Sequence, residues 1–497
     1  MNVKATASER EMKRLHRKAH FIFITLVLKI TFLANLSSQI DLEKVPTERK
    51  TRTVKIINNV LPSVAAIQTY RPSGTEGVYN LQVGAASVIH EDGYLITNEH
   101  VVSGMIQGNA TLFGKQSKPF KVIASMTSED LAIIKVDTKD KLKKIALGRS
   151  HDLLLGEPVI TIGNPGGLNH SISTGVISGL NRSTSTGTAF LPWMIQTSAA
   201  VSGGNSGGPL INALGQQIGT ITSKQLGSEN INFAISIDRI RDVLPNLLSP
   251  ELRYGFWIGI EVDMLSEGAK IKSITNKSPA QIAGLMINDK IKSINGTPLS
   301  NPFDYYFSLI GLNKNDKINL NILRNDNPLD IEIILGELNL IEPVEQKELT
   351  PGINYRVYNG QWDKLPNFNE LTSSNEGGAE EISADPASNE LNDHYGLMFE
   401  GYLKINEEGL YTFSLSSDDG SQFIIGDEML INNDGLHSFV SVEGRTRLKK
   451  GFFPIKILYF EHSGDQRLEL QYKGPGIKMQ PIPKEALFSN KDNQLNE

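Results

Sequence analysis

Residues 203–209 read Gly-Gly-Asn-Ser-Gly-Gly-Pro and place one serine, Ser206, among four glycines. Glycine lets the backbone adopt dihedral angles that other residues avoid, and it brings amide N–H groups close to the group that a serine hydroxyl attacks. Acyl transfer requires both features, so the stretch predicts a nucleophile loop. A glycine-rich hairpin turn with a solvated serine is the alternative when this stretch is taken alone.

Two upstream segments supply the partners of such a serine. A serine hydroxyl is a poor nucleophile at neutral pH unless a base takes its proton and a carboxylate orients that base. His100 follows an apolar strand and a polar turn, and Asp130 directly precedes the apolar run Leu-Ala-Ile-Ile at residues 131–134. The order His100, Asp130, Ser206 therefore predicts a catalytic triad.

Three ordered motifs resemble the HtrA (Deg) family of serine proteases. They are Thr-Asn-Glu-His-Val-Val at residues 97–102, Asp-Leu-Ala-Ile-Ile-Lys at 130–135 and Gly-Asn-Ser-Gly-Gly-Pro at 204–209. Residues 163–168, 173–178 and 232–235 are similar to further strands of that family. The resemblance implies a mainly β protein with a chymotrypsin-like double β-barrel, a trypsin-like serine protease domain at residues 54–248.

The same resemblance implies a role for each motif residue. Ser206 attacks the scissile carbonyl, His100 accepts its proton and later donates it to the leaving amine, and Asp130 stabilises the imidazolium. The backbone N–H groups of Gly204 and Ser206 form the oxyanion hole. No cofactor is expected for catalysis.

Departures from the family pattern affect specificity rather than chemistry. Ser198 stands where an aspartate is common and Ser202 where an asparagine is common, and neither is a triad member. The primary specificity pocket, expected near Ala200 and residues 232–235, has no obvious buried charge, which predicts cleavage after small or medium apolar residues. His90 precedes Glu-Asp-Gly at a turn and is predicted to be a solvated hairpin residue, not a base.

Composition restricts the range of functions. The chain has 497 residues, enough for roughly three domains, and its 39% hydrophobic and 21% charged residues are typical of a globular protein. A formal net charge of −6 gives no support for nucleic-acid binding. Because cysteine is absent from the sequence, disulfides, thiol nucleophiles and cysteine-based zinc sites are excluded.

The first 38 residues are predicted to be a signal peptide. Basic residues precede the apolar run at residues 21–28, which is the layout of a secretory signal. Lys29 interrupts the run, and since a charge at the centre of a bilayer costs about 3 kcal/mol, the run makes a poor permanent span. We expect export to the periplasm or cell envelope, with an uncleaved N-terminal membrane anchor as the alternative. Residues 39–53 are predicted to be a linker.

A PDZ domain is predicted at residues 251–338. The segments that resemble this family are residues 255–260, 269–274, 278–285 and 288–296. A PDZ domain pairs an extended peptide C-terminus with a sheet edge and captures the carboxylate with backbone N–H groups. The resemblance implies that Trp257, Ile258, Gly259 and Ile260 form the capturing loop. Alternatively, these apolar residues belong to a core strand.

Residues 350–488 are predicted to form a β-sandwich, because apolar and polar residues alternate there between turn signals. The segment resembles the protective-antigen-type domain of secreted carbohydrate-active enzymes and adhesins. Some members bind sugar through calcium held by adjacent aspartates, which would be Asp418 and Asp419 here, and oxygen ligands suit calcium. We favour the alternative, since Asp-Asp-Gly between two strands is also an ordinary hairpin turn.

Two functions follow from the sequence. The first is an exported HtrA-type endopeptidase that hydrolyses misfolded or unassembled envelope proteins, with peptide C-termini bound at the PDZ domain and a glycan as a candidate ligand of the last domain. The family resemblance implies a homotrimer. The second is a binding or chaperone-like scaffold whose protease fold is idle. The complete set of triad residues favours the first.

Overall fold

The computed structural model describes residues 44–75, 77–167, 170–185, 190–224, 230–338, 340–345, 348–388 and 391–490. The predicted signal peptide and the start of the predicted linker lie outside the described residues. The rest of that linker contains a 3-10 helix, η2 (Thr47–Arg49), and the start of α2 (Arg52–Val60). Within these ranges, no helix is long and apolar enough to cross a membrane.

The first β-barrel is closed by six strands in the order β1-β2-β3-β6-β5-β4. Their bounds are β1 (Val64–Pro72), β2 (Tyr79–His90), β3 (Tyr94–Thr97), β4 (Gln107–Leu112), β5 (Ser117–Met126) and β6 (Leu131–Val136). Branched apolar side chains fill the interior, and those of Ile67, Val88, Leu95 and Ile134 are fully buried. The short helix α3 (Glu99–Val102) follows β3 directly.

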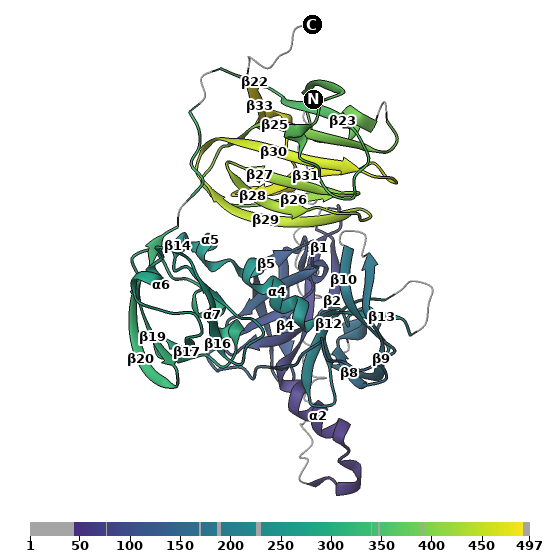
Figure 1. The fold of residues 1–497 in the computed structure, drawn as a ribbon. Coiled ribbons are helices and arrows are strands. Elements are labelled where there is room, and N and C mark those ends of the chain that lie inside the picture. Colours follow the sequence, from purple (N-terminus) through teal and green to yellow (C-terminus); the bar gives the residue numbers. More distant parts are fainter. Residues whose placement is uncertain are drawn as a thin grey trace, which may run out of the picture.

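A second ring of six strands runs β11-β8-β9-β10-β13-β12 and is closed by pairing of β11 with β12. The bounds are β8 (Pro158–Gly163), β9 (Ser171–Ser185), β10 (Phe190–Thr197), β11 (Pro209–Ile211), β12 (Gln216–Lys224) and β13 (Asn232–Ser236), with β7 (Ala146–Leu147) beside β12. Helix α4 (Ile237–Leu248) follows β13. The two closed barrels confirm the predicted chymotrypsin-like fold (Figure 1).

The next domain begins after α5 (Pro250–Tyr254) and is built on a sheet of order β15-β16-β17-β19-β20. Its strands are β15 (Ile260–Val262), β16 (Ala269–Ile274), β17 (Lys290–Ile294), β18 (Thr297–Pro298), β19 (Lys317–Arg324) and β20 (Asn327–Ile334), and its helices are α6 (Pro279–Ile282) and α7 (Pro302–Ser308). Strands β14 (Phe256–Trp257) and β21 (Gly336–Glu337) pair with each other. Because β15 lies at the edge of the sheet, one of its sides has no strand partner among the described residues.

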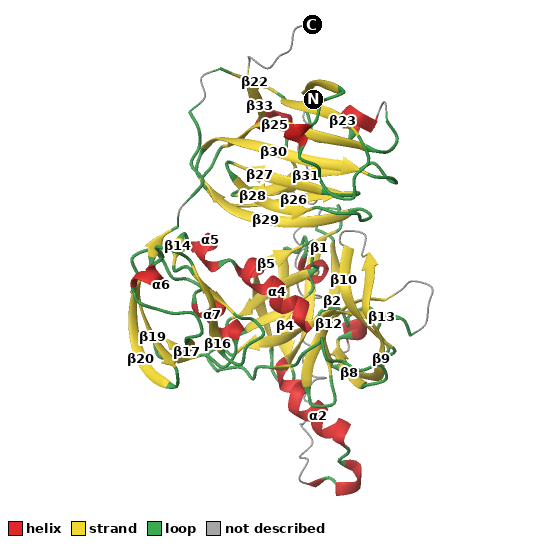
Figure 2. Ribbon diagram, in the orientation of Figure 1, coloured by secondary structure: helices red, strands yellow, loops and turns green. Residues whose placement is uncertain are grey.

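The C-terminal domain consists of two sheets, as predicted (Figure 2). One contains β22 (Leu349–Pro351), β23 (Ile353–Asn359), β24 (Asn375–Ala379), β25 (Tyr395–Ile405), β27 (Ser421–Ile425), β28 (Glu428–Asn433), β30 (Gly451–Glu461) and β33 (Leu487–Asn490). The other contains β26 (Gly409–Ser417), β29 (Val440–Leu448), β31 (Leu468–Gly474) and β32 (Ile477–Pro481). Phe413 of one sheet meets Phe423 of the other with 5.0 Å between ring centroids, so the core lies between the sheets.

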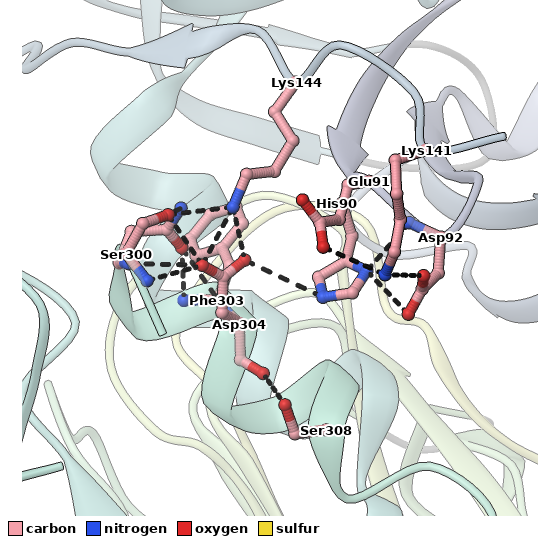
Figure 3. Close-up of polar contacts among 10 residues, drawn as sticks. His90, Glu91, Asp92, Lys141, Lys144, Ser300, Phe303, Asp304 and Ser308 are labelled. Carbon is pink, nitrogen blue, oxygen red and sulfur yellow. Dashed lines mark hydrogen bonds and ion pairs between the residues drawn. The ribbon is translucent and has the colours of Figure 1, made fainter. Parts of the chain in front are cut away.

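The PDZ domain packs on the first barrel through α7 (Figure 3). Lys144 Nζ lies 2.9 Å from Asp304 Oδ2 at the start of that helix. The ring of Phe307 stacks on Tyr94 with 4.8 Å between centroids and lies 5.2 Å from the ring of His90. An ion pair and an aromatic cluster therefore join the two domains.

His90 is buried at this contact, so the prediction that it is solvated was wrong. It is only 4% exposed, and its Nε2 lies 3.9 Å from Asp304 Oδ1. The turn sequence after β2 is typical of a solvent-exposed hairpin, but α7 of a later domain packs against His90 and covers it. Burial lowers the pKa of His90, while the charges of Asp304 and Asp92 oppose the shift.

The substitution His90→Phe should make the stability of the protein less sensitive to acid. Because the pKa of His90 is lowered in the folded state, the unfolded chain binds more protons below about pH 6.5, and stability is lost as the pH falls through that value. Phenylalanine keeps the ring contacts and removes the titration. The quantity to measure is the melting temperature of the variant minus that of the original protein. We expect this difference to be larger at about pH 5.5 than at about pH 7.5. A difference that does not change with pH would contradict the lowered pKa.

Candidate active site

The structure brings His100 and Asp130 together. His100 lies in α3, whereas Asp130 ends the turn between β5 and β6. Nδ1 of His100 is 2.9 Å from both carboxylate oxygens, and the backbone N–H of His100 donates to Asp130 Oδ1 at 3.0 Å. The Asp130 side chain is 4% exposed and that of His100 is 37% exposed. A buried carboxylate thus favours the tautomer with a proton on Nδ1 and leaves Nε2 to act as a base.

The turn that carries Asp130 is held by several contacts. Asp130 has φ +49°, a left-handed conformation that is uncommon outside glycine. Its N–H donates to the Thr127 carbonyl at 3.1 Å, and its carbonyl accepts from Asn98 Nδ2 at 2.9 Å. The hydroxyl of Thr222 donates to Asp130 Oδ2. The carboxylate is therefore held from both barrels, since Thr222 belongs to β12.

The Ser206 loop lies where the two barrels meet, and its glycines allow the close approach. A Cβ on Gly204 (φ +105°) would lie 2.1 Å from the Asn164 carbonyl oxygen, next to β8. A Cβ on Gly207 (φ +84°) would lie 2.2 Å from the Ala85 carbonyl oxygen in β2. The Ser206 carbonyl in turn accepts the N–H of Ala85 at 2.8 Å. Glycine is required at both positions for this packing.

The Ser206 hydroxyl points to a backbone carbonyl in this structure. It donates to the Thr222 carbonyl at 3.1 Å and, within the described part of the chain, forms no hydrogen bond with His100. The backbone N–H groups of Gly204 and Ser206 donate to no acceptor among the described residues. Two uncommitted N–H groups beside the nucleophile are what an oxyanion hole needs.

Two further side chains, those of Thr222 and Asn98, contact Asp130 and were not predicted. Thr222 lies 92 residues after Asp130 and belongs to no motif, so only closure of the second barrel reveals it. Asn98 lies inside the motif that contains His100 and is fully buried. A polar residue between a strand and the base was a usable signal for a positioning role.

The predicted PDZ loop, Trp257–Ile260, has its donors already occupied. The N–H groups of Ile258 and Gly259 donate to Glu251 Oε1 at 2.6 and 3.0 Å. Burial raises the pKa of Glu251, and these two donors oppose the shift. The side chains of Ile258 and Ile260 are buried, so the loop contributes to the core through its side chains and binds a carboxylate through its backbone.

Asp418 and Asp419, the predicted calcium ligands, bind backbone N–H groups of neighbouring loops. Asp419 accepts from His437 at 3.2 Å and from His462 at 2.8 Å, and Asp418 accepts from Asp465 at 3.2 Å. Nowhere in the described ranges do three or more metal-ligating side chains gather as a metal site. These contacts tie three loops together, and calcium binding stays a prediction.

Three family models match the chain. A trypsin-like peptidase domain matches residues 84–219, a PDZ domain matches residues 257–335 and a PA14 domain matches residues 349–486. The PA14 match confirms the protective-antigen-type domain that the sequence predicts.

Two curated relatives each match 57% of the chain. "Protease Do-like 1, chloroplastic" of Arabidopsis thaliana is 33% identical over 312 residues, which cover 57% of this chain and 71% of the relative. A "probable periplasmic serine endoprotease DegP-like" of Pseudomonas fluorescens is 30% identical over 298 residues, and the chain spans 61% of its length.

Two solved structures match the chain at lower sequence identity than these relatives. The HtrA-type protease AlgW with a tripeptide is 28% identical with a TM-score of 0.36, and the match covers 57% of this chain and 97% of that one. The serine endoprotease from Yersinia pestis is 25% identical with a TM-score of 0.34, covering 60% and 100%. The sequence relatives, together with the trypsin-like peptidase and PDZ matches, show that this chain belongs to the HtrA (protease Do-like) family of serine proteases.

Proposed function

We propose that the protein is an exported serine endopeptidase that hydrolyses peptide bonds of misfolded or unassembled envelope proteins. The observation that carries this proposal is the pairing of the buried Asp130 carboxylate with Nδ1 of His100 at 2.9 Å, next to the Ser206 loop. Relatives named as periplasmic serine endoproteases support a location in the periplasm or envelope. An uncleaved N-terminal anchor is the alternative mode of export.

Catalysis uses this chain's own groups. The Ser206 hydroxyl turns to Nε2 of His100 and attacks the scissile carbonyl while the imidazole takes its proton. Asp130 stabilises the imidazolium, and the N–H groups of Gly204 and Ser206 stabilise the oxyanion, each worth roughly 3 kcal/mol. His100 then protonates the leaving amine. Water, activated by the same imidazole, hydrolyses the acyl-enzyme and regenerates Ser206.

Cleavage after small or medium apolar residues is the specificity that the pocket region supports. Residues 232–235 carry no charged side chain, and Ala234 and Ile235 are buried. Asn232 Nδ2 donates to the Ala199 carbonyl at 2.9 Å, so this amide is used within the wall beside Ala200.

Capture of peptide C-termini by the PDZ domain is the second part of the proposal. One edge of strand β15 has no strand partner within the described ranges, and the N–H groups of Ile258 and Gly259 form a carboxylate site. The same donors cannot serve Glu251 and a peptide fully at once, so Glu251 must move first. The homotrimer, and a glycan or calcium ligand for the last domain, stay predictions.

A binding or chaperone-like scaffold is the competing function. The observation that favours it is the Ser206 hydroxyl, which donates to the Thr222 carbonyl and forms no hydrogen bond with His100 in the described chain. A protein in which this hydrogen bond never broke would not hydrolyse peptide bonds.

Casein cleavage by residues 39–497, compared with the Ser206→Ala variant, tests which function applies. We expect turnover by the unsubstituted protein and a loss of several orders of magnitude in the variant, since removal of the nucleophile of a triad costs roughly 10⁶-fold in kcat. Absence of turnover in both proteins, even with apolar peptide C-termini added, would favour the scaffold.

The Thr222→Val variant should lower kcat about tenfold and leave KM unchanged, because one hydrogen bond to a buried carboxylate is lost. Peptide-cleavage kinetics measure this. Thr220→Val is the matched control, since the Thr220 hydroxyl accepts from Gln217 and touches no triad residue. Equal kcat for the two variants would argue against a role of Thr222 in holding Asp130.

The Glu251→Ala variant should bind a peptide with a free apolar C-terminus at least about tenfold more tightly, because the loop donors no longer have an internal acceptor. Fluorescence anisotropy on a Ser206→Ala background measures the affinity. Glu267→Ala, an exposed position in the same domain, is the matched control, and an amidated peptide should show no gain. Unchanged affinity would mean that Glu251 does not compete.

A further inference from the structure

The C-terminal β-sandwich packs on the protease through one face of β29. Figure 1 shows β29 facing α5, and a Cβ on Gly255, which ends α5, would lie 3.6 Å from Arg447. Side chains alternate along a strand, so Thr446 and Leu448 point into the sandwich while Glu443 and Arg445 point outward. Outward positions of a sheet normally face water. Here the Glu443 and Arg445 side chains are only 1% and 6% exposed because the protease covers them.

Glu443 binds the turn that carries Asp130. Its Oε1 accepts the backbone N–H of Thr127 at 2.8 Å, across 316 residues of sequence. Thr127 is the first residue of the turn, and its carbonyl accepts the N–H of Asp130 at 3.1 Å. Thr127 therefore links two parts of the molecule. Its N–H contacts the last domain, and its carbonyl contacts the proposed catalytic aspartate.

Arg445 binds the strand that enters the same turn. Its Nη2 donates to the Ser125 carbonyl at 2.6 Å, and its Nη1 donates to the Asn246 and Leu247 carbonyls at 2.5 and 3.1 Å. The last two belong to the C-terminal turn of α4, where the carbonyl end of the helix dipole favours a cation. The guanidinium also lies 3.3 Å from Glu443 Oε2, which completes the ion pair.

The charge of Glu443 also acts on the segment that contains His100. Burial lowers the pKa of Arg445, and the charge of Glu443 opposes the shift. Burial raises the pKa of Glu99, the neighbour of His100, and the charges of Asp130 and Glu443 raise it further. Glu443 therefore shares an electrostatic environment with the base and its carboxylate.

We propose that Glu443 and Arg445 are positioning residues for catalysis, which act by fixing the turn that holds Asp130. The left-handed conformation of Asp130 is strained for a residue other than glycine and persists only where the surroundings determine it. The pair supplies two of these contacts, on Thr127 and Ser125, from outside the protease domain. Attachment of the C-terminal domain and the geometry of His100 and Asp130 are thereby coupled.

Contacts inside the protease limit the size of the effect. Glu129, in the same turn, pairs with Arg239 of α4 with 2.9 Å between Oε2 and Nε, and Asn98 holds the carbonyl of Asp130. Loss of the Glu443 and Arg445 contacts should therefore weaken the turn without abolishing activity.

The test is the double variant Glu443→Met/Arg445→Met in the full chain. Replacement of both partners of a buried ion pair by apolar residues of similar volume leaves no unpaired charge, so the interface can persist while the hydrogen bonds are lost. The matched control is Arg467→Met/Glu469→Met, an exposed ion pair at the start of β31, which belongs to the same sheet and is separated from β29 by β26. Steady-state peptide cleavage and the low-field proton resonance of His100 Nδ1–H are the readouts.

We expect kcat to fall about tenfold with KM unchanged, and the His100 Nδ1–H resonance to broaden, in the interface variant alone. Unchanged kcat and an unchanged resonance in a folded variant would overturn the proposal, as would a change in KM alone. If the double variant fails to fold, Glu443→Gln and Glu443→Ala decide. Higher kcat for glutamine, which still accepts the Thr127 N–H, supports positioning, and equal kcat overturns it.

The inference rests on the proposed protease function only through the kinetic readout. If the unsubstituted protein had no turnover, the protease proposal would fail, yet the His100 resonance would still show whether Glu443 and Arg445 control the geometry of the turn. A resonance that is identical in the original protein and in the interface variant would then overturn the positioning role.

Discussion

The burial of one carboxylate, that of Asp130, is the constraint on which the arrangement of the protease depends. A buried charge is tolerated only when hydrogen-bond donors surround it. Here the donors are the N–H and Nδ1 of His100 and the hydroxyl of Thr222. Because α3 follows a strand of the first barrel and β12 belongs to the second, the carboxylate fixes how the two barrels meet. The imidazole of His100 is oriented as a consequence of that packing.

The loop of Ser206 differs from the Asp130 carboxylate, which accepts several hydrogen bonds. The loop packs closely on both barrels, yet two of its backbone N–H groups have no acceptor among the described residues. Gly204 and Gly207 permit the approach to Asn164 and Ala85, and the N–H groups of Gly204 and Ser206 have no acceptor in the part of the chain that the structure describes. The Ser206 hydroxyl donates to the backbone carbonyl of Thr222, the residue whose side-chain hydroxyl contacts Asp130. Strand β12 thus contacts both the nucleophile and the carboxylate, so small movements of this strand affect both.

The sequence was most informative where function restricts local chemistry. Glycines around a serine, a histidine after a strand and an aspartate before one are visible as short motifs. Resemblance of ordered motifs to known families predicted the double barrel and the PDZ domain, and the alternation of apolar and polar residues predicted the sandwich. Thr222, Glu251 and Glu443 could not be found in this way, because each acts through a contact that folding creates between segments without motifs. His90 shows the same limit, since its turn is ordinary and only the docking of α7 removes it from solvent.

Two carboxylates of this chain, those of Glu251 and Glu443, occupy backbone N–H groups in places where function is decided: the PDZ loop and the turn of Asp130. The Glu251 contact joins α5 to the predicted PDZ loop, and the Glu443 contact joins the C-terminal domain to the protease, so the domains are not independent modules. The proposed protease activity requires Ser206 to be an activated nucleophile.

Covalent labelling tests that claim most directly. An organophosphorus fluoride such as diisopropyl fluorophosphate reacts with a serine only when a neighbouring base and an oxyanion hole activate it. Mass spectrometry of the digested protein should locate the adduct on Ser206, and the Asp130→Asn variant should lose it. Absence of an adduct, or an adduct on another serine, would contradict the proposed catalytic arrangement.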